Sequence, residues 1–305
     1  MTTITKVAVA GAKGTLGEFV LEAIINAGFQ VTVLSRKEST QTFPSTVTVK
    51  HVDYSSVDSL TEALQGQDAV VSTIGGHGLS QQIPLVEAAA KAGVKRFLPS
   101  EFGSNTFNEN ASQLPAYQQK VEVQKALAKA ASESGLTWTA VMCGPFFDWG
   151  IETGFLANPK TRTLELPDGG ENKFSASTLT TVGKAVVAVL KNPEQTKNRQ
   201  VFVQDLALTQ KELAALLKKA VGAEGWTETV TSIQEKIQEG YEEIKKENGN
   251  FWVFLFASLR AAIWGAGYGG HFEKLDNELL GIKQLTPDEV EEVVKKSVAK
   301  AQATL

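Results

Sequence analysis

A glycine-rich turn follows the first apolar run of the chain and opens a helical pattern. Residues 6–12 read KVAVAGA, and residues 14–28 show helical periodicity, with Gly11, Gly14 and Gly17 in the spacing G-x-x-G-x-x-G. Glycine there lets the chain turn, lets the backbone approach a phosphate and lets helix pack closely on strand. The unpaired N–H groups of the helix start suit a pyrophosphate, which predicts a dinucleotide site rather than a merely tight turn. The candidate cofactor-binding residues of this turn are Gly11, Lys13, Gly14, Thr15, Leu16 and Gly17.

Strand-like and helical segments alternate through the first half of the chain. We expect strands at 6–12, 30–35, 46–52, 69–74, 95–99 and 136–142, with helices at 14–28, 59–64, 84–92 and 118–134 between them. The strands have few polar positions, which indicates a parallel sheet covered by helices on both faces. Right-handed crossovers then give a doubly wound Rossmann sheet in an α/β fold.

The alternation stops after residue 145. A helix at 180–190 and a strand near 199–205 precede a mostly helical remainder. We expect residues 1–150 to form a dinucleotide-binding domain to which the strand near 199–205 returns. Residues 151–305 are expected to form a smaller, mostly helical substrate-binding lobe that is interleaved with the first domain.

Composition excludes several classes of protein. The 30 basic and 34 acidic residues leave no basic excess for nucleic acid. One cysteine, Cys143, and three widely separated histidines give no metal-ligand spacing. The apolar run at 251–267 is short for a membrane span and is interrupted by Arg260, so it predicts a buried helix or a lid. The start of the chain lacks an apolar signal region, and we expect a cytoplasmic protein without a metal.

The end of the second strand indicates which nucleotide is preferred. NAD-specific sites place a carboxylate there, whereas this chain has Ser35, Arg36 and Lys37 before its first acid, Glu38. Arg36 can form charge-assisted hydrogen bonds to a 2′-phosphate, with Lys37 as a second positive charge, so NADP(H) is favoured over a pair of solvated cations. Asp53, after the third strand, is placed to meet the adenine edge or to cap a helix.

Four segments together resemble the NmrA-like/isoflavone reductase-like family, and most closely its fungal members. They are GAKGTLG, STIGGHG, VEAAAKAGVKRFLPSEFG and MCGPFFDWG. The resemblance spans nearly the whole chain and is sharpest over residues 5–150. It implies an atypical short-chain dehydrogenase, an NADPH-dependent reductase that transfers hydride to a small aromatic or conjugated substrate.

The resemblance also implies a lysine beside the nicotinamide, on the helix after SEFG. Lys120 matches it in the pattern K-x-x-V-x-x-x-L, and Lys125 is the competing position. The lysine is expected to assist a proton transfer to or from oxygen. Tyr117 shares the helix face of Lys120, but its spacing is one residue short of the Tyr–Lys pair of ordinary short-chain dehydrogenases, so it is assigned to the substrate pocket.

Several loops at the strand ends are expected to complete the site. By resemblance, the loop after the fourth strand wraps the nicotinamide ribose, with His77 as a general acid or a plain loop residue. The remaining cofactor-binding candidates are Thr73, Gly75, Gly76, Gln82, Pro145 and Phe147. The substrate-pocket candidates are His77, Phe102, Tyr117, Phe146, Trp149 and Trp264. Phe102 could instead pack in the core, Glu101 could cap a helix, form an ion pair or act in catalysis, and Trp264 belongs to an aromatic run that also suits a core.

A second function fits the same nucleotide site. The family includes NAD(P)-binding regulatory proteins that act through a protein partner without turnover. Such proteins often lack the helix lysine, so Lys120 favours the enzyme. The aromatic second lobe favours it as well.

Overall fold

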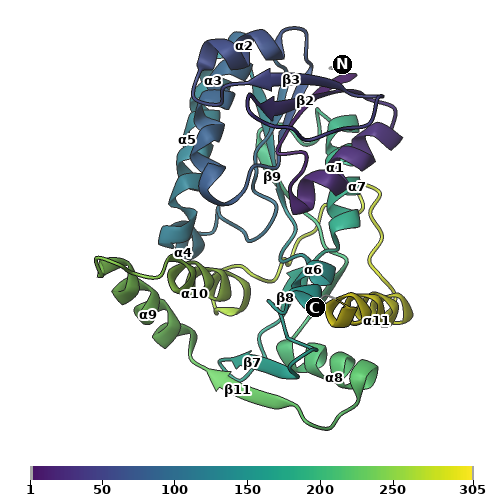
Figure 1. Cartoon of the computed structure of the whole chain (residues 1–305), viewed down its shortest axis with the longest axis vertical. Coiled ribbons are helices and arrows are strands. Elements are labelled where there is room, and N and C mark those ends of the chain that lie inside the picture. The colour runs from purple at the N-terminus through teal and green to yellow at the C-terminus, as the bar shows by residue number, and fades with distance from the viewer. Residues whose placement is uncertain (1–2, 304–305) are drawn as a thin grey trace.

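A computed structural model describes residues 3–303 of the chain. Its centre is a seven-stranded sheet in the order β3-β2-β1-β4-β5-β6-β9, and all neighbouring strands are parallel (Figure 1). The strands are β1 (Lys6–Ala10), β2 (Gln30–Arg36), β3 (Thr48–Val52), β4 (Ala69–Ser72), β5 (Arg96–Leu98), β6 (Thr137–Met142) and β9 (Arg199–Phe202). The direction of winding reverses between β1 and β4, and open α/β sheets bind ligands at such a point. The doubly wound parallel sheet expected from the sequence is confirmed.

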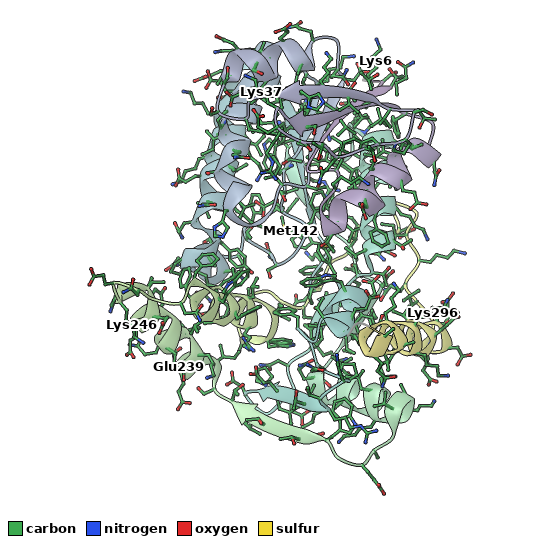
Figure 2. All side chains as sticks on the ribbon, in the orientation of Figure 1. Lys6, Lys37, Met142, Glu239, Lys246 and Lys296 are labelled. Carbon is green, nitrogen blue, oxygen red and sulfur yellow. The ribbon has the colours of Figure 1, made fainter. Side chains whose placement is uncertain are left out.

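Helices cover both faces of this sheet (Figure 1). One face carries α1 (Thr15–Asn26) and α7 (Leu179–Lys191), and the other carries α2 (Val57–Leu64), α3 (Gln82–Lys91) and α5 (Gln118–Ser134). Alternate residues of β1 supply the two cores, since Val7 and Val9 pack toward α1 while Ala8 and Ala10 pack toward α2 and α3. Figure 2 shows side chains filling these layers, with Met142 inside and Lys6 and Lys37 at the periphery.

The strand expected near 199–205 is β9, which pairs with β6 at the edge of the sheet. The segment that follows α10 (Phe251–Trp264) runs past the outer side of β9. There the Asp276 carboxylate accepts hydrogen bonds from Arg199 Nη2 at 2.8 Å and from the Phe202 N–H at 2.9 Å. This segment therefore covers an edge strand that would otherwise expose unpaired backbone groups.

A second lobe lies below the carboxyl ends of the strands (Figure 1). Its helices are α6 (Phe147–Glu152), α8 (Gln210–Val221), α9 (Ile233–Lys245), α10 and α11 (Pro287–Ala303). Four short strands were not expected: β7 (Thr163–Pro167) pairs with β11 (Thr227–Thr231), and β8 (Phe174–Ala176) with β10 (Leu206–Leu208). The lobe has its own apolar core, which includes Leu213, Val294 and Trp264.

Helix α10 is the long apolar run seen in the sequence. Phe254, Ala257, Ala261 and Trp264 are buried, whereas its first turn is exposed at Phe251, Trp252 and Val253. Within residues 3–303, no helix combines the length and hydropathy that crossing a bilayer requires.

Candidate active site

The phosphate loop has the close contacts that its glycines predict. Gly11 has φ +82°, and a Cβ there would lie 2.8 Å from the backbone carbonyl carbon of Thr73. A Cβ on Gly17 would lie 2.1 Å from the Gly11 carbonyl oxygen. Only glycine fits either position, because the loop runs directly against β4 and helix α1 against the loop.

The start of α1 is open to an anion. Its N-cap is Gly14, which has no side chain to satisfy the N–H groups of the first turn. Thr15 is exposed, while the side chain of Leu16 packs in the core, so Leu16 can offer only its backbone N–H. These donors and the helix dipole fit the pyrophosphate of a dinucleotide.

A cleft of about 780 Å³ extends from this loop across the ends of β1, β2 and β4. The candidate residues that line it are Gly11, Lys13, Gly14, Ser35, Arg36, Thr73, Gly75 and His77. Tyr54 and the segment 38–43, which includes Glu38, line it as well and were not expected. The cleft therefore joins the phosphate loop to Arg36 at the end of β2.

Lys37 and Asp53 lie outside the lining of this cleft. Lys37 Nζ is 4.0 Å from Asp53 Oδ2. The Asp53 carboxylate accepts hydrogen bonds from the hydroxyl and N–H of Ser55, which hold the pKa of Asp53 below its usual range. Ser56 caps α2, so Asp53 is not a helix cap, and Arg36 is the basic residue of this pair that lines the cleft.

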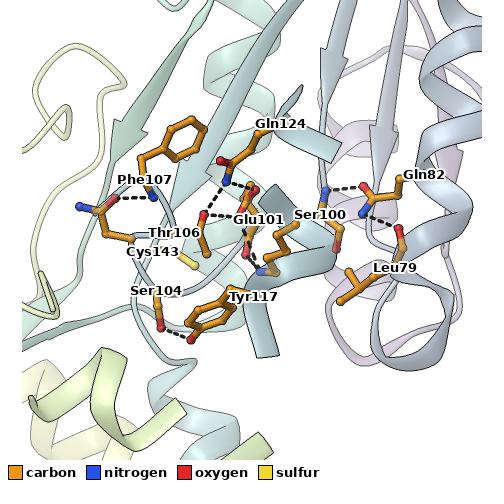
Figure 3. Close-up of polar contacts among 12 residues, drawn as sticks. Leu79, Gln82, Ser100, Glu101, Ser104, Thr106, Phe107, Tyr117, Gln124 and Cys143 are labelled. Atoms are coloured by element: carbon orange, nitrogen blue, oxygen red, sulfur yellow. Dashed lines mark hydrogen bonds and ion pairs between the residues drawn. The ribbon is translucent and has the colours of Figure 1, made fainter. Parts of the chain in front are cut away.

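Gln82 braces the loop after β4 rather than facing the cleft. This residue is almost completely buried, and its Oε1 accepts the Ser100 N–H at 2.8 Å while its Nε2 donates to the Leu79 carbonyl at 3.4 Å (Figure 3). We therefore revise its assignment from cofactor contact to loop support. Gly76, with φ +57°, begins the short helix η1 (Gly76–Gln81) that Gln82 supports.

Lys120 points toward the loop after β5. Its Nζ donates to the Glu101 carbonyl oxygen at 2.5 Å and lies 3.7 Å from Glu101 Oε2. The side chain of Lys120 is 15% exposed. Lys125, five residues later on α5, is 67% exposed and pairs with Glu122, so it faces solvent, whereas Lys120 faces the loop after β5.

The neighbours of Lys120 are buried and hydrogen-bonded. Figure 3 shows Tyr117, whose hydroxyl donates to Ser104 Oγ at 2.9 Å, and Cys143 beside the same cluster. Burial raises the pKa of the Tyr117 phenol and the pKa of the Cys143 thiol far above their usual values. Tyr117, assigned above to the substrate pocket, is instead buried and fixed in an apolar cluster beside Lys120, whose Nζ lies 5.8 Å from the centre of its ring.

The aromatic candidates divide into two groups. Phe146 and Trp149 are partly exposed, and Pro145, also partly exposed, accepts the Ser177 N–H with its carbonyl. Phe102, Phe147 and Trp264 are buried in apolar clusters and do not form a pocket wall. We revise these three to core residues. The backbone N–H of Phe147 donates to the Ser177 carbonyl at 2.8 Å, so it is not free to bind a cofactor.

Asp148 has a structural role between these aromatic residues. Its carboxylate accepts the N–H groups of Trp149 and of Leu179, the first residue of α7. Burial raises the pKa of this carboxyl, although the two N–H groups oppose the rise. Asp148 thus ties α6 to the start of α7.

The sequence did not identify the partners of Glu101. Thr106 and Gln124 hydrogen-bond its carboxylate, and Gln124 lies one turn after Lys120 on α5. That i, i+4 spacing was the available signal, because it puts Lys120 and Gln124 on one helix face. Among residues 3–303, no group of three or more His, Cys, Asp or Glu side chains could hold a metal ion.

Comparison with known proteins gives a consistent result. The model of the NmrA-like family matches residues 3–247. Oxidoreductase aprR of Aspergillus flavus is 37% identical over 292 residues, which cover 93% of this chain and 97% of that protein. Oxidoreductase poxI of Penicillium oxalicum is 31% identical, with 93% and 92% covered. The solved structure of AtPrR2 with NADP+ and (+)pinoresinol shares the fold, with a TM-score of 0.77, 24% identity and coverage of 97% and 100%.

Proposed function

Because the chain belongs to the NmrA-like family, we propose that it is an NADPH-dependent reductase that transfers hydride to a small aromatic or conjugated substrate. The observation that carries the proposal is that one continuous cleft joins the phosphate loop to Arg36. The fungal relatives named oxidoreductases, 37% and 31% identical, support a redox enzyme. In this proposal residues 1–150, together with β9, hold the nucleotide, and residues 151–305 form most of the substrate side.

The residues of the cleft suit a phosphorylated nucleotide. The open N–H groups at the start of α1 would hold the pyrophosphate, and Arg36 would bind a 2′-phosphate. Glu38 also lines the cleft, but it stands two residues beyond Arg36, which ends β2 itself. When bound, the nicotinamide supplies a hydride from its C4 to an electrophilic carbon.

Lys120 is the proposed catalytic residue. It lies on the carboxyl side of the sheet, where ligands bind in this fold, and its ammonium group is held in place by Glu101. There it can move a proton to or from a substrate oxygen as the adjacent carbon is reduced. The partly exposed rings of Phe146 and Trp149 would contact a planar substrate.

The test begins with binding. The intrinsic tryptophan fluorescence of the full chain is titrated with NADPH, with NADH, and with 2′,5′-ADP and 5′-AMP, which differ only in the 2′-phosphate. NADPH consumption is then followed with conjugated aromatic carbonyl compounds and enol ethers. We expect tight NADPH binding, preference for 2′,5′-ADP and turnover of some of these compounds. Binding of neither nucleotide would overturn the proposal, and binding without turnover would favour a regulatory nucleotide sensor.

A further inference from the structure

The carboxylate of Glu101 is the centre of a closed polar network with Thr106 and Gln124 (Figure 3), and Lys120 lies 3.7 Å from it. Only 1% of the Glu101 side chain is exposed. Its Oε2 accepts the Thr106 hydroxyl at 2.6 Å and its Oε1 accepts Gln124 Nε2 at 2.9 Å. Gln124 Nε2 also donates to Thr106 Oγ1 at 2.9 Å, which closes the ring of contacts.

The network connects two separate segments of the chain. Glu101 and Thr106 lie in the loop after β5, and Lys120 and Gln124 lie on α5. Burying a carboxylate is costly unless its oxygen atoms are hydrogen-bonded or paired with a charge. Here each carboxylate oxygen accepts a hydrogen bond, and the ammonium of Lys120 lies 3.7 Å from Oε2. These contacts offset the cost of burying the carboxylate.

The network reaches Lys120 through Glu101. Thr106 and Gln124 fix the Glu101 side chain, and the same residue binds Lys120 Nζ through its backbone carbonyl at 2.5 Å. Thr106 is fully buried and Glu101 nearly so, and neither can touch a substrate. The side chain of Lys120 is 15% exposed and that of Glu101 only 1%, so the ammonium of Lys120 is the charged group of the network that is open to solvent.

Resting on the reductase function proposed above, we propose that Glu101, Thr106 and Gln124 are positioning residues that hold the ammonium group of Lys120 at the angle and depth needed for proton transfer. They act on the reaction through Lys120 alone. A proton donor displaced by a fraction of an ångström loses much of its effect, so loosening the network lowers turnover without weakening nucleotide binding.

Thr106 offers a matched pair of variants. Thr106→Val keeps the shape of the side chain and removes the hydroxyl that donates to Glu101, and Thr106→Ser keeps the hydroxyl. We expect Thr106→Val to lower kcat about tenfold, with KM for NADPH within about twofold of the wild-type value. Thr106→Ser should recover most of kcat. Wild-type kcat in Thr106→Val, or equal loss of kcat in both variants, would overturn the proposal.

A second readout does not depend on turnover. The full-length protein is treated briefly with an amine-acetylating reagent, and modification of each lysine is measured by mass spectrometry. Release from Glu101 should make Lys120 in Thr106→Val react several times faster than in the wild type, and Thr106→Ser should stay at the wild-type rate. Lys125, on the same helix and paired with Glu122, is the internal control and should not change.

The two readouts separate the possible failures. If the wild-type protein reduces none of the compounds, the reductase proposal fails, and the labelling of Lys120 still shows whether the network holds it. If turnover is seen and Lys120 labelling does not respond to Thr106→Val, the positioning role fails. If Thr106→Val does not fold, Gln124→Met takes its place in both measurements, because it removes the donor to Glu101 Oε1. The positioning role then fails if Gln124→Met changes neither kcat nor the labelling of Lys120.

Discussion

The ring of His77 lies 5.5 Å from the ring of Phe251, centre to centre, with the two planes tilted by 37°. His77 is on η1, which lines the cleft of the sheet domain, and Phe251 is the first residue of α10 in the second lobe. Both side chains are exposed, so the contact joins the two lobes at the mouth of the cleft. Three glycines at and near the start of η1, Gly75, Gly76 and Gly78, give this loop backbone freedom, so the His77–Phe251 contact adds to the support that Gln82 gives it.

Phe251→Ala should therefore loosen the loop after β4. An aromatic contact of this kind contributes about 1 kcal/mol, and its loss should speed amide hydrogen exchange in residues 75–81 by roughly fivefold. Hydrogen exchange with mass spectrometry measures this directly. Val253→Ala is the control, because Val253 is exposed in the same first turn of α10 and carries no ring. If residues 75–81 exchange at the same rate in both variants, the order of the loop after β4 does not depend on the Phe251 ring.

Arg36→Ala should weaken NADPH binding by about 10- to 100-fold, because hydrogen bonds to a charged phosphate are worth roughly 1.5–3 kcal/mol. NADH binding should change by less than about threefold, since NADH has no 2′-phosphate. Lys37→Ala removes the same charge one residue later and should have a small effect, because Lys37 faces Asp53 outside the cleft. Fluorescence titration measures all three affinities. An unchanged ratio of NADPH to NADH affinity in Arg36→Ala would contradict the assignment.

Lys120→Met should reduce turnover by about 100-fold or more, because it removes the proton donor or acceptor while keeping most of the apolar stem. NADPH affinity should stay within a few-fold of the wild-type value. Lys125→Met, on the exposed face of α5, should retain full activity. Steady-state kinetics and nucleotide titration give both quantities. Parallel losses of turnover and affinity would mean that Lys120 binds the cofactor and does not act in the chemical step.

Asp68→Asn should destabilise the protein more at neutral pH than in acid. Partial burial works to raise the pKa of Asp68, but hydrogen bonds from Lys95, from the N–H of Lys6 and from Thr5 outweigh it and hold the pKa well below its usual range. A carboxylate with a depressed pKa stabilises the fold above its unfolded pKa of about 4, and this stabilisation is lost as the pH falls further.

Urea unfolding at pH 7 and near pH 3 measures the effect. We expect Asp68→Asn to lower the free energy of unfolding by about 1–2 kcal/mol at pH 7. The difference from wild type should shrink at the lower pH. Glu22→Gln, which alters an exposed carboxylate on α1, should change stability little at either pH. A difference for Asp68→Asn that is constant with pH would show that its charge is not what matters.

Cys143 should be unreactive in the folded protein. It is fully buried, and burial raises the pKa of its thiol, so little thiolate is present at neutral pH. A thiol-specific reagent should therefore modify the chain only in denaturant, where the single cysteine reacts. Rapid modification of the native protein would indicate local opening at the end of β6.

Much of the sheet domain was determined by the sequence because its signals are local. The apolar run of β1 and the glycines of the phosphate loop act within a few residues of one another. The same holds for Arg36, which was expected at the 2′-phosphate because it ends a strand. Lys120 was placed by family resemblance, and its competitor Lys125 could be set aside only when the structure showed it in solvent.

Tertiary structure decided everything that depends on partners far apart in the chain. The strands β7, β8, β10 and β11 lie where the alternation of strands and helices has stopped, and each pairs with a segment distant in the sequence. Phe147 and Trp264 resembled pocket residues by position, but packing within the second lobe buried them in its core. Neighbouring residues such as Arg36 and Lys37 carry the same charge, and only the fold determines that one lines the cleft while the other turns to Asp53.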